Sequence, residues 1–263
     1  MTPPPTPPTL DDLRDAVRTV EDRTAVTDRR VRTGWLPVDR TLGSGLRRGC
    51  LHEWHGSGSD DPGGGEGSDW LPPLYLFGHL AQQAIGDHHG LVVWIGTRCH
   101  PQPPVLSGQG PTADRLLRRS LFVNPATDAD RLWAVDQAAR NPAVAAVVAD
   151  AAGLDLRAGR RLQLAAEQAA ALVLLARPPD EHNRPTAAWS RWWITPEPSP
   201  NPSPRWTVAL TRCKGLRPTA PDHRRWTLEW NHDACAVRPR SPVADRTSPT
   251  TPNIIPRHKR RIA

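Results

Sequence analysis

The segment from Gly56 to Ser68 has the residue types that could hold a phosphate group. It is rich in glycine, follows a strand-like run at residues 49–54 and precedes a helix-like run at residues 71–85. A phosphate-binding loop has this setting, because its backbone N–H groups cradle the phosphates. The residues that would form the loop are Gly56, Gly58, Gly63, Gly64, Gly65, Gly67 and Ser68.

The loop lacks the side chains that phosphoryl chemistry needs. A P-loop places a lysine beside the terminal phosphates and a Ser or Thr on Mg²⁺, but the lysines of this chain, Lys214 and Lys259, lie far downstream. Carboxylates stand in or beside the loop instead: Asp60, Asp61, Glu66 and Asp69. A carboxylate 4 Å from a phosphate charge costs about 4 kcal/mol at an effective dielectric of ~20. We therefore expect a degenerate P-loop, with neither ATP nor Mg²⁺ as a cofactor.

Two other acidic residues lie on apolar runs. Asp150 ends the run Val144–Ala149, where a Walker-B acid would hold Mg²⁺; an Asp there also caps turns, and both interpretations stay open. Glu53, between His52 and Trp54, is interpreted as a polar residue at a strand edge. No metal site is expected, because the histidines show neither HxxxH nor HExxH spacing.

The apolar runs alternate between the periods of strands and helices. Further strand-like runs lie at 91–95, 121–123, 144–150 and 171–176, and helix-like runs at 128–140 and 158–169. This alternation predicts an α/β domain with three layers and a mostly parallel central sheet. Later strand-like runs follow one another without helices, at 189–195, 206–211 and 226–230. We expect them as antiparallel strands added at the C-terminal edge of the sheet.

Three parts of the chain are expected from composition. Residues 1–32 hold a Pro-rich start and an amphipathic helix, residues 33–235 form the folded domain, and residues 236–263 form a disordered basic tail. The helix has one apolar face, formed by Leu10, Leu13, Val17 and Val20. This face could fold back on its own domain or dock on a partner, and the sequence leaves both open.

The net charge of +7 comes mostly from the tail. Residues 236–263 hold seven basic residues and one acid, so the remainder is nearly neutral. The tail residues that could contact DNA phosphates or a partner are Arg257, Lys259, Arg260 and Arg261. A second candidate contact set follows Asp150 and consists of Arg157, Arg160 and Arg161; the alternative is the solvated start of a helix.

Composition argues against several other classes of protein. The longest apolar run has eight residues, whereas a membrane-spanning helix needs about 20, and no secretory signal pattern follows Met1. The four cysteines form no CxxC pair, which favours a reducing cytoplasm over a disulfide framework. The late tryptophans favour packing between strands and helices over stacking on nucleobases.

The body of the chain resembles the ImuA family, RecA-related proteins of bacterial damage-induced mutagenesis. The matching segments are Thr33–Asp39, Gly45–Glu53, Val92–Ile95, Ala146–Asp150, Leu154–Glu167, Arg205–Pro218 and Trp226–Trp230. The resemblance implies a RecA-like fold whose members commonly lack intact nucleotide-hydrolysis motifs. In RecA-type enzymes a catalytic Glu follows the strand that corresponds to Leu91–Ile95, and Arg98 stands in that neighbourhood here. A guanidinium cannot act as a carboxylate base.

The resemblance also implies a role in the SOS response. It implies a non-catalytic accessory protein of a translesion synthesis complex, the mutasome, with an ImuB-type Y-family-like polymerase and an error-prone polymerase as partners. RecA filaments or DNA are further expected contacts. The alternatives are a divergent DNA-dependent ATPase of the RecA superfamily and a cell-division inhibitor similar to SulA. Turnover of ATP would favour the first alternative, and arrest of division on overexpression would favour the second.

Overall fold

Parallel strands form the middle of the molecule. The computed structural model describes residues 30–56, 70–87, 90–107, 114–199, 203–216 and 224–240. Its main sheet has the strand order β11-β10-β9-β8-β3-β7-β6-β4-β5 in this described part. The parallel strands are β3 (Cys50–Gly56), β4 (Leu91–Ile95), β5 (Ser120–Val123), β6 (Val144–Asp150), β7 (Leu172–Arg177) and β8 (Ser190–Glu197). The predicted α/β domain with a mostly parallel sheet is confirmed.

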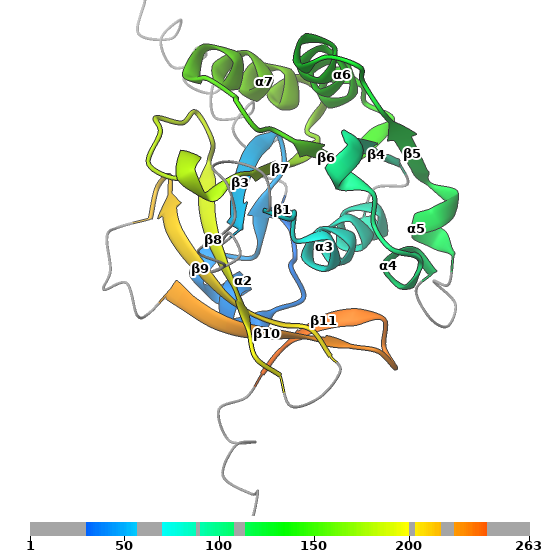
Figure 1. The fold of residues 1–263 in the computed structure, drawn as a ribbon, viewed down its shortest axis with the longest axis vertical. Coiled ribbons are helices and arrows are strands. Elements are labelled where there is room, and N and C mark those ends of the chain that lie inside the picture. The colour runs from blue at the N-terminus through cyan, green and yellow to red at the C-terminus, as the bar shows by residue number, and fades with distance from the viewer. Residues whose placement is uncertain are drawn as a thin grey trace, which may run out of the picture.

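Helices cover both faces of these strands (Figure 1). On one face lie α6 (Asp128–Arg140) and α7 (Leu156–Ala169), and on the other lies α3 (Leu74–Asp87), with the short helices α4 (Pro103–Ser107) and α5 (Arg115–Arg118) beside it. Side chains alternate between the faces, so Val147 and Val173 pack with α6 and α7, while Trp94 and Leu174 pack with α3. Burial on both faces explains why these strands read as continuous apolar runs.

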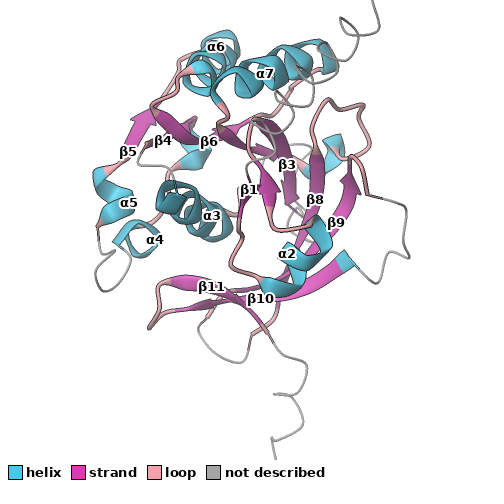
Figure 2. Cartoon of the chain, turned by 180° about the vertical axis from the view of Figure 1, so that it is seen from behind, coloured by secondary structure: helices cyan, strands magenta, loops and turns pink. Residues whose placement is uncertain are grey.

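The N-terminal part of the described chain forms a small separate sheet and one helix. Strands β1 (Arg30–Val31) and β2 (Leu46–Arg47) pair antiparallel. Between them along the chain lies α2 (Leu36–Leu42), which buries Val38 and Leu42 and overlaps the late strands in the view of Figure 2. Two single turns complete the elements, η1 (Thr97–Cys99) and η3 (Pro179–Glu181).

The late strands match the expected antiparallel edge with one correction. Strands β9 (Arg205–Cys213), β10 (Arg225–Asn231) and β11 (Ala236–Pro239) are antiparallel to their neighbours. The first of the late strands, β8, instead pairs parallel with β3. The reason is the connection at residues 178–189, which is long enough to carry the chain back across the sheet.

The expected limit of the folded domain at residue 235 is also wrong. Strand β11 extends the sheet to Pro239, and Val237 is buried. The indole Nε1 of Trp35 donates to the Val237 carbonyl over 3.0 Å, and the Val237 N–H donates to His79 Nδ1 over 3.4 Å. A short Pro- and Arg-containing segment is therefore folded because one of its side chains completes the core. The remainder of the expected tail lies outside the described residues.

Tryptophans pack inside the late part of the sheet, as predicted. Trp192 and Trp230 are buried, and Trp192 stacks on Trp54 with ring centroids 4.8 Å apart. Because aromatic rings bury large areas, this pair joins the parallel strand β3 firmly to the antiparallel edge.

Candidate functional site

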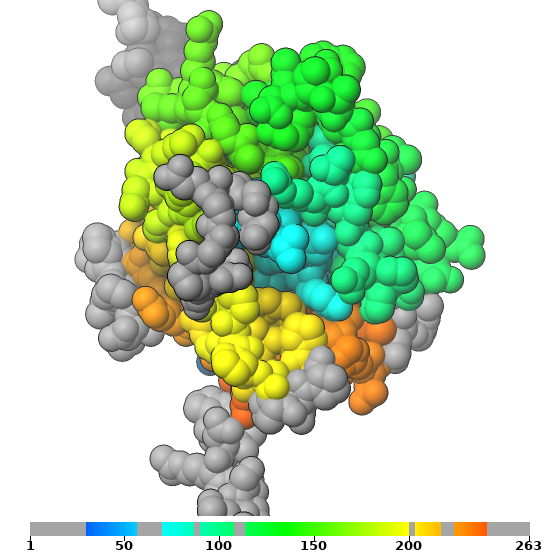
Figure 3. All heavy atoms as spheres, viewed as in Figure 1, coloured from blue at the N-terminus to red at the C-terminus, as the bar shows by residue number. Residues whose placement is uncertain are grey.

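A cleft opens at the carboxyl ends of the parallel strands, where open α/β sheets bind their ligands. It has a volume of about 500 Å³ and lies between the end of β3, the start of α3, the segment 98–105 and strands β8 and β9. Figure 3 shows this side of the molecule, with the cyan atoms of α3 between the teal segment that follows it and the yellow late strands. The side chains that close the cleft are Tyr75, Arg98, His100, Gln102, Ile194 and Trp206.

The predicted phosphate loop belongs to this cleft through its first residue. Gly56 ends β3, and a Cβ there would lie 3.1 Å from the Leu71 carbonyl oxygen. The other loop residues, Gly58, Gly63, Gly64, Gly65, Gly67 and Ser68, lie outside the described residues.

The helix that follows begins poorly for phosphate binding. The N-terminus of a helix binds anions through free backbone N–H groups. Here Pro72 and Pro73 precede α3 and carry no N–H, and the Leu74 N–H donates to the Pro72 carbonyl over 2.8 Å. The start of α3 therefore offers fewer free amides than a helix without these prolines.

Asp150 stands at the predicted position, and its carboxylate is already engaged. Its Oδ1 accepts from the Ala152 N–H over 3.0 Å, and its Oδ2 lies 3.3 Å from Arg98 Nη1. The Asp150 side chain is 4% exposed and that of Arg98 is 38% exposed. The structure is compatible with both interpretations of Asp150, because its carboxylate caps a turn and also lies beside the cleft, where a Walker-B acid would be.

Glycine at position 96 lets the chain place Arg98 beside this acid. Gly96 has φ +100°, and a Cβ there would lie 3.0 Å from the Asp150 Cβ. The turn η1 then brings the Arg98 guanidinium over the Trp70 ring, 5.5 Å from its centroid. A guanidinium remains charged at all ordinary pH values, so Arg98 places a fixed positive charge beside the carboxylate that would hold Mg²⁺.

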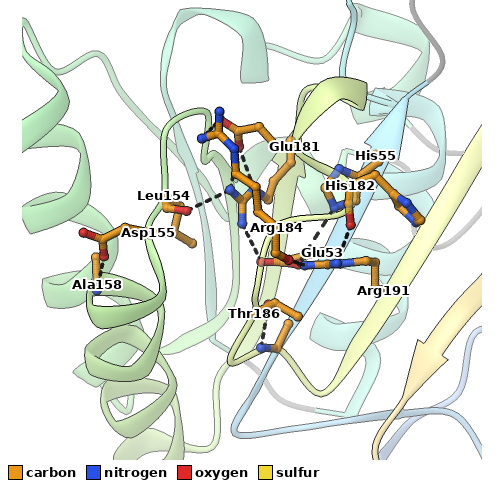
Figure 4. Close-up of polar contacts among 12 residues, drawn as sticks. Glu53, His55, Leu154, Asp155, Ala158, Glu181, His182, Arg184, Thr186 and Arg191 are labelled. Carbon is orange, nitrogen blue, oxygen red and sulfur yellow. Dashed lines mark hydrogen bonds and ion pairs between the residues drawn. The ribbon is translucent and has the colours of Figure 1, made fainter.

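Glu53 is the residue that sequence reasoning misjudged most. It is buried in the middle of the sheet, not at a strand edge, because β7 and β8 flank β3 on its two sides. Figure 4 shows the ion-pair network around it. Glu53 Oε1 lies 2.8 Å from Arg177 Nη1, and Glu53 Oε2 lies 2.9 Å from Arg191 Nη2.

The network extends from Glu53 to the turn after β7. Arg177 also donates to Glu181 Oε2 over 2.5 Å and to the Leu154 carbonyl over 2.8 Å. Glu181 Oε1 accepts from the Gly153 N–H and from the partly exposed Arg184. These bonds fix the connection between β7 and β8 to the turn that precedes α7.

Charge neutralisation keeps Glu53 ionised. Burial by itself raises the pKa of Glu53, but the neighbouring His55 imidazole and the Arg177 and Arg191 guanidinium groups outweigh it and lower the pKa to about 2. A carboxylate held by two arginines is a poor proton acceptor at neutral pH. We therefore assign Glu53 to stability, not to acid–base chemistry. The sequence contains an arginine on each of the strands β7 and β8, but it does not show that these strands flank β3. The pairing of Arg177 and Arg191 with Glu53 therefore follows only from the strand order.

The arginines of α7 form an exposed row. Arg157, Arg160 and Arg161 are exposed, and Arg161 Nε lies 3.5 Å from Asp136 Oδ1 on α6. The helix begins two residues earlier than expected, at Leu156, because the Asp155 carboxylate caps it by accepting from the Ala158 N–H over 2.7 Å. The row therefore lies on the outer surface of the α6–α7 layer, away from the cleft at Gly56.

Two other predicted features fall on residues that the structure does not describe. The apolar face at Leu10, Leu13, Val17 and Val20 and the tail residues Arg257, Lys259, Arg260 and Arg261 lie outside the described residues. Within the described ranges, no group of three His, Cys, Asp or Glu side chains could hold a metal ion. The helices found there include none that is long and apolar enough to cross a membrane.

Comparison with known proteins finds relatives in sequence and a solved structure with a similar fold. No protein-family model matches the chain. Two proteins named Protein ImuA, from two strains of Caulobacter vibrioides, are each 36% identical to it over 197 residues, which cover 67% of this chain and 75% of each relative. Among solved structures, the RadB recombinase matches with a TM-score of 0.56 and 14% identity, over 80% of this chain and 100% of that one. At this identity the match shows the fold alone, which is RecA-like.

Proposed function

Because the chain belongs to the ImuA family and has a RecA-like fold, we propose that it is a non-catalytic accessory protein of a damage-induced translesion synthesis complex. In this role it works through protein contacts in the cytoplasm, with an ImuB-type polymerase as its main partner and an error-prone polymerase in the same complex. A RecA filament or DNA provides further contacts.

The Arg98–Asp150 pair is the observation that carries the non-catalytic part of this proposal. A Walker-B acid acts by holding Mg²⁺, but a Mg²⁺ ion beside Asp150 would have to displace or approach a guanidinium that is 3.3 Å from the same oxygen. Two like charges in a partly buried site repel strongly. The ion pair therefore favours a fold that keeps its shape without nucleotide hydrolysis.

The distribution of lysine supports the same proposal. Lys214 lies just after β9, where its Nζ donates to the Ala187 carbonyl over 2.7 Å, and it does not line the cleft at Gly56. The other lysine, Lys259, lies outside the described residues. A divergent ATPase would then need a lysine other than Lys214 to neutralise the terminal phosphates.

Co-purification with the ImuB-type polymerase tests the proposed partnership. We expect the same yield of complex in Mg·ATP and in EDTA, because no step of assembly uses nucleotide. In cells, Asp150→Asn at wild-type protein level should leave damage-induced mutagenesis unchanged. Loss of mutagenesis in this variant, or a complex that forms only with Mg·ATP, would contradict the proposal.

A further inference from the structure

A second groove lies between α7 and the segments that precede β8 and follow β9. It has a volume of about 400 Å³, and we call it the α7 groove. Helix α7 forms one wall through Leu156, Arg160, Gln163 and Leu164. The other wall is formed by Thr186, Ala187 and Lys214.

The α7 groove combines an exposed apolar side chain with positive charge. Leu164 is 60% exposed, whereas Leu162, Ala165 and Ala166 on the same helix are buried. Arg160 and Lys214 stand on the two walls, and Arg157 and Arg161 are exposed on the same helix. Such a surface fits an amphipathic segment that is acidic on its polar side.

The chain itself has a segment of this kind. Residues 10–22 read LDDLRDAVRTVED, with five acidic and two basic side chains, and their apolar face is Leu10, Leu13, Val17 and Val20. As a helix, 13 residues would be about 20 Å long, which is close to the length of α7. Charge and apolar pattern are thus complementary to the groove.

The position of Arg30, the first described residue, places this segment within reach. Arg30 pairs across β1 and β2 with Arg47, whose guanidinium lies 4.5 Å from the centroid of the Trp189 ring. The Trp189 carbonyl accepts from the Lys214 N–H over 2.8 Å, and Lys214 lines the groove. Residues 23–29 connect the two parts and can span about 23 Å when extended.

We infer that residues 10–22 dock on the α7 groove of their own chain, with the apolar face on Leu164 and the carboxylates toward Arg160 and Lys214. This inference goes beyond the proposed function and does not depend on it. Of the two alternatives that the sequence left open for this helix, it selects the fold-back.

Disulfide trapping in the full-length chain tests this docking. The Val17→Cys/Leu164→Cys double variant is prepared with the half-buried Cys213 and Cys235 changed to serine, then oxidised at low protein concentration. We expect an intramolecular disulfide in most molecules. The matched control is Val17→Cys/Leu117→Cys, which should give little product. Leu117 on α5 is also exposed, at 47%, but it lies beside β5 at the other end of the sheet.

Charge reversal separates specific docking from chance collision. Arg160→Glu/Lys214→Glu should lower the yield of the disulfide about tenfold at low salt, and adding Asp12→Arg/Asp15→Arg should restore it. Arg238→Glu on β11 is the control and should have no effect. Equal yields from the two cysteine pairs, a disulfide-linked dimer as the main product, or a yield that ignores charge reversal would each overturn the inference. A groove that binds single-stranded DNA while the yield stays at the control level would overturn it too.

Discussion

Single charged residues decide what this fold can do. Arg98 neutralises Asp150 at the edge of the cleft, and Arg177 and Arg191 neutralise Glu53 inside the sheet. In both places a carboxylate that could serve chemistry is held by a guanidinium. The two pairs differ in burial, because Arg98 is partly exposed while Arg177 and Arg191 are buried, so their loss has different consequences.

Glu53→Gln should strongly destabilise the protein. The change leaves the buried Arg191 without its carboxylate partner and Arg177 with Glu181 alone, and breaking a buried pair by removing one partner costs about 3–5 kcal/mol. Urea unfolding measures this loss. Glu167→Gln on the exposed side of α7 is the control and should change the free energy of unfolding by less than about 0.5 kcal/mol. Equal effects of the two changes would refute the structural role of Glu53.

Two buried histidines should make the fold sensitive to mild acid. Burial lowers the pKa of His52 and of His79 to about 4, while in the unfolded chain both would protonate near pH 6.5. The unfolded state therefore binds more protons between pH 6.5 and 4, and stability falls as pH falls through this window, by up to about 1.4 kcal/mol per pH unit for each histidine.

The slope of the free energy of unfolding against pH identifies the contribution of the buried histidines, whereas the stability at a single pH does not. His79→Asn should remove the His79 share of the decrease in stability between pH 6.5 and 4, whatever it does at neutral pH. The shares of His52 and of His182, whose pKa is also lowered by burial, remain. The exposed His100→Asn is the control and should leave the slope as it is. Glu53, with its pKa lowered to about 2, contributes stability that is lost only at lower pH, as the pH falls from about 4.5. A slope unchanged in His79→Asn would contradict the account.

Most elements of the fold could be predicted from periodicity, because the parallel strands are continuous apolar runs and the helices between them have a clear apolar face. The direction of β8 could not, because Trp189–Thr195 alternates equally well in a parallel or an antiparallel strand. Helix α2 was missed because seven residues around Pro37 show too little period. Of the candidate site, Asp150 and Arg98 were placed by position in the chain, but their contact needed the turn at Gly96.

The β1–β2 pairing depends on a glycine that no other residue can replace. Gly45 has φ +127°, and a Cβ there would lie 2.2 Å from the Val31 carbonyl oxygen. Gly43 also has a positive φ, +68°, but a Cβ there meets nothing within 4 Å. Gly43→Ala should therefore cost about 1 kcal/mol from the left-handed backbone alone, and Gly45→Ala should cost clearly more. Thermal unfolding compares them, and equal melting temperatures would argue against this pairing.

The folded domain extends further toward the C-terminus than composition predicts. Composition assigned residues 236–263 to a tail, but β11 adds a strand and the buried Val237 to the core. The domain has a RecA-like fold, and the cleft at the carboxyl ends of its strands is lined by aromatic side chains, prolines and the paired Arg98. This lining agrees with the proposed non-catalytic function.

Truncation locates the true limit of the domain. A chain ending at Arg240 should keep the melting temperature of the full-length protein. A chain ending at Cys235 should have a melting temperature several degrees lower. Removing Val237 alone loses about 1.5–3 kcal/mol of stabilisation from apolar burial. Equal melting temperatures of the two truncated chains would return the limit to residue 235.

Turnover of ATP by the purified full-length chain, in the presence of its ImuB-type partner and single-stranded DNA, tests the central claim most directly. We predict a rate equal to that of the partner and DNA without the chain, and no change on Asp150→Asn. An added rate that Asp150→Asn abolishes, while the variant still folds and binds the partner, would show that Arg98 yields its place to Mg²⁺ and that the fold is an enzyme.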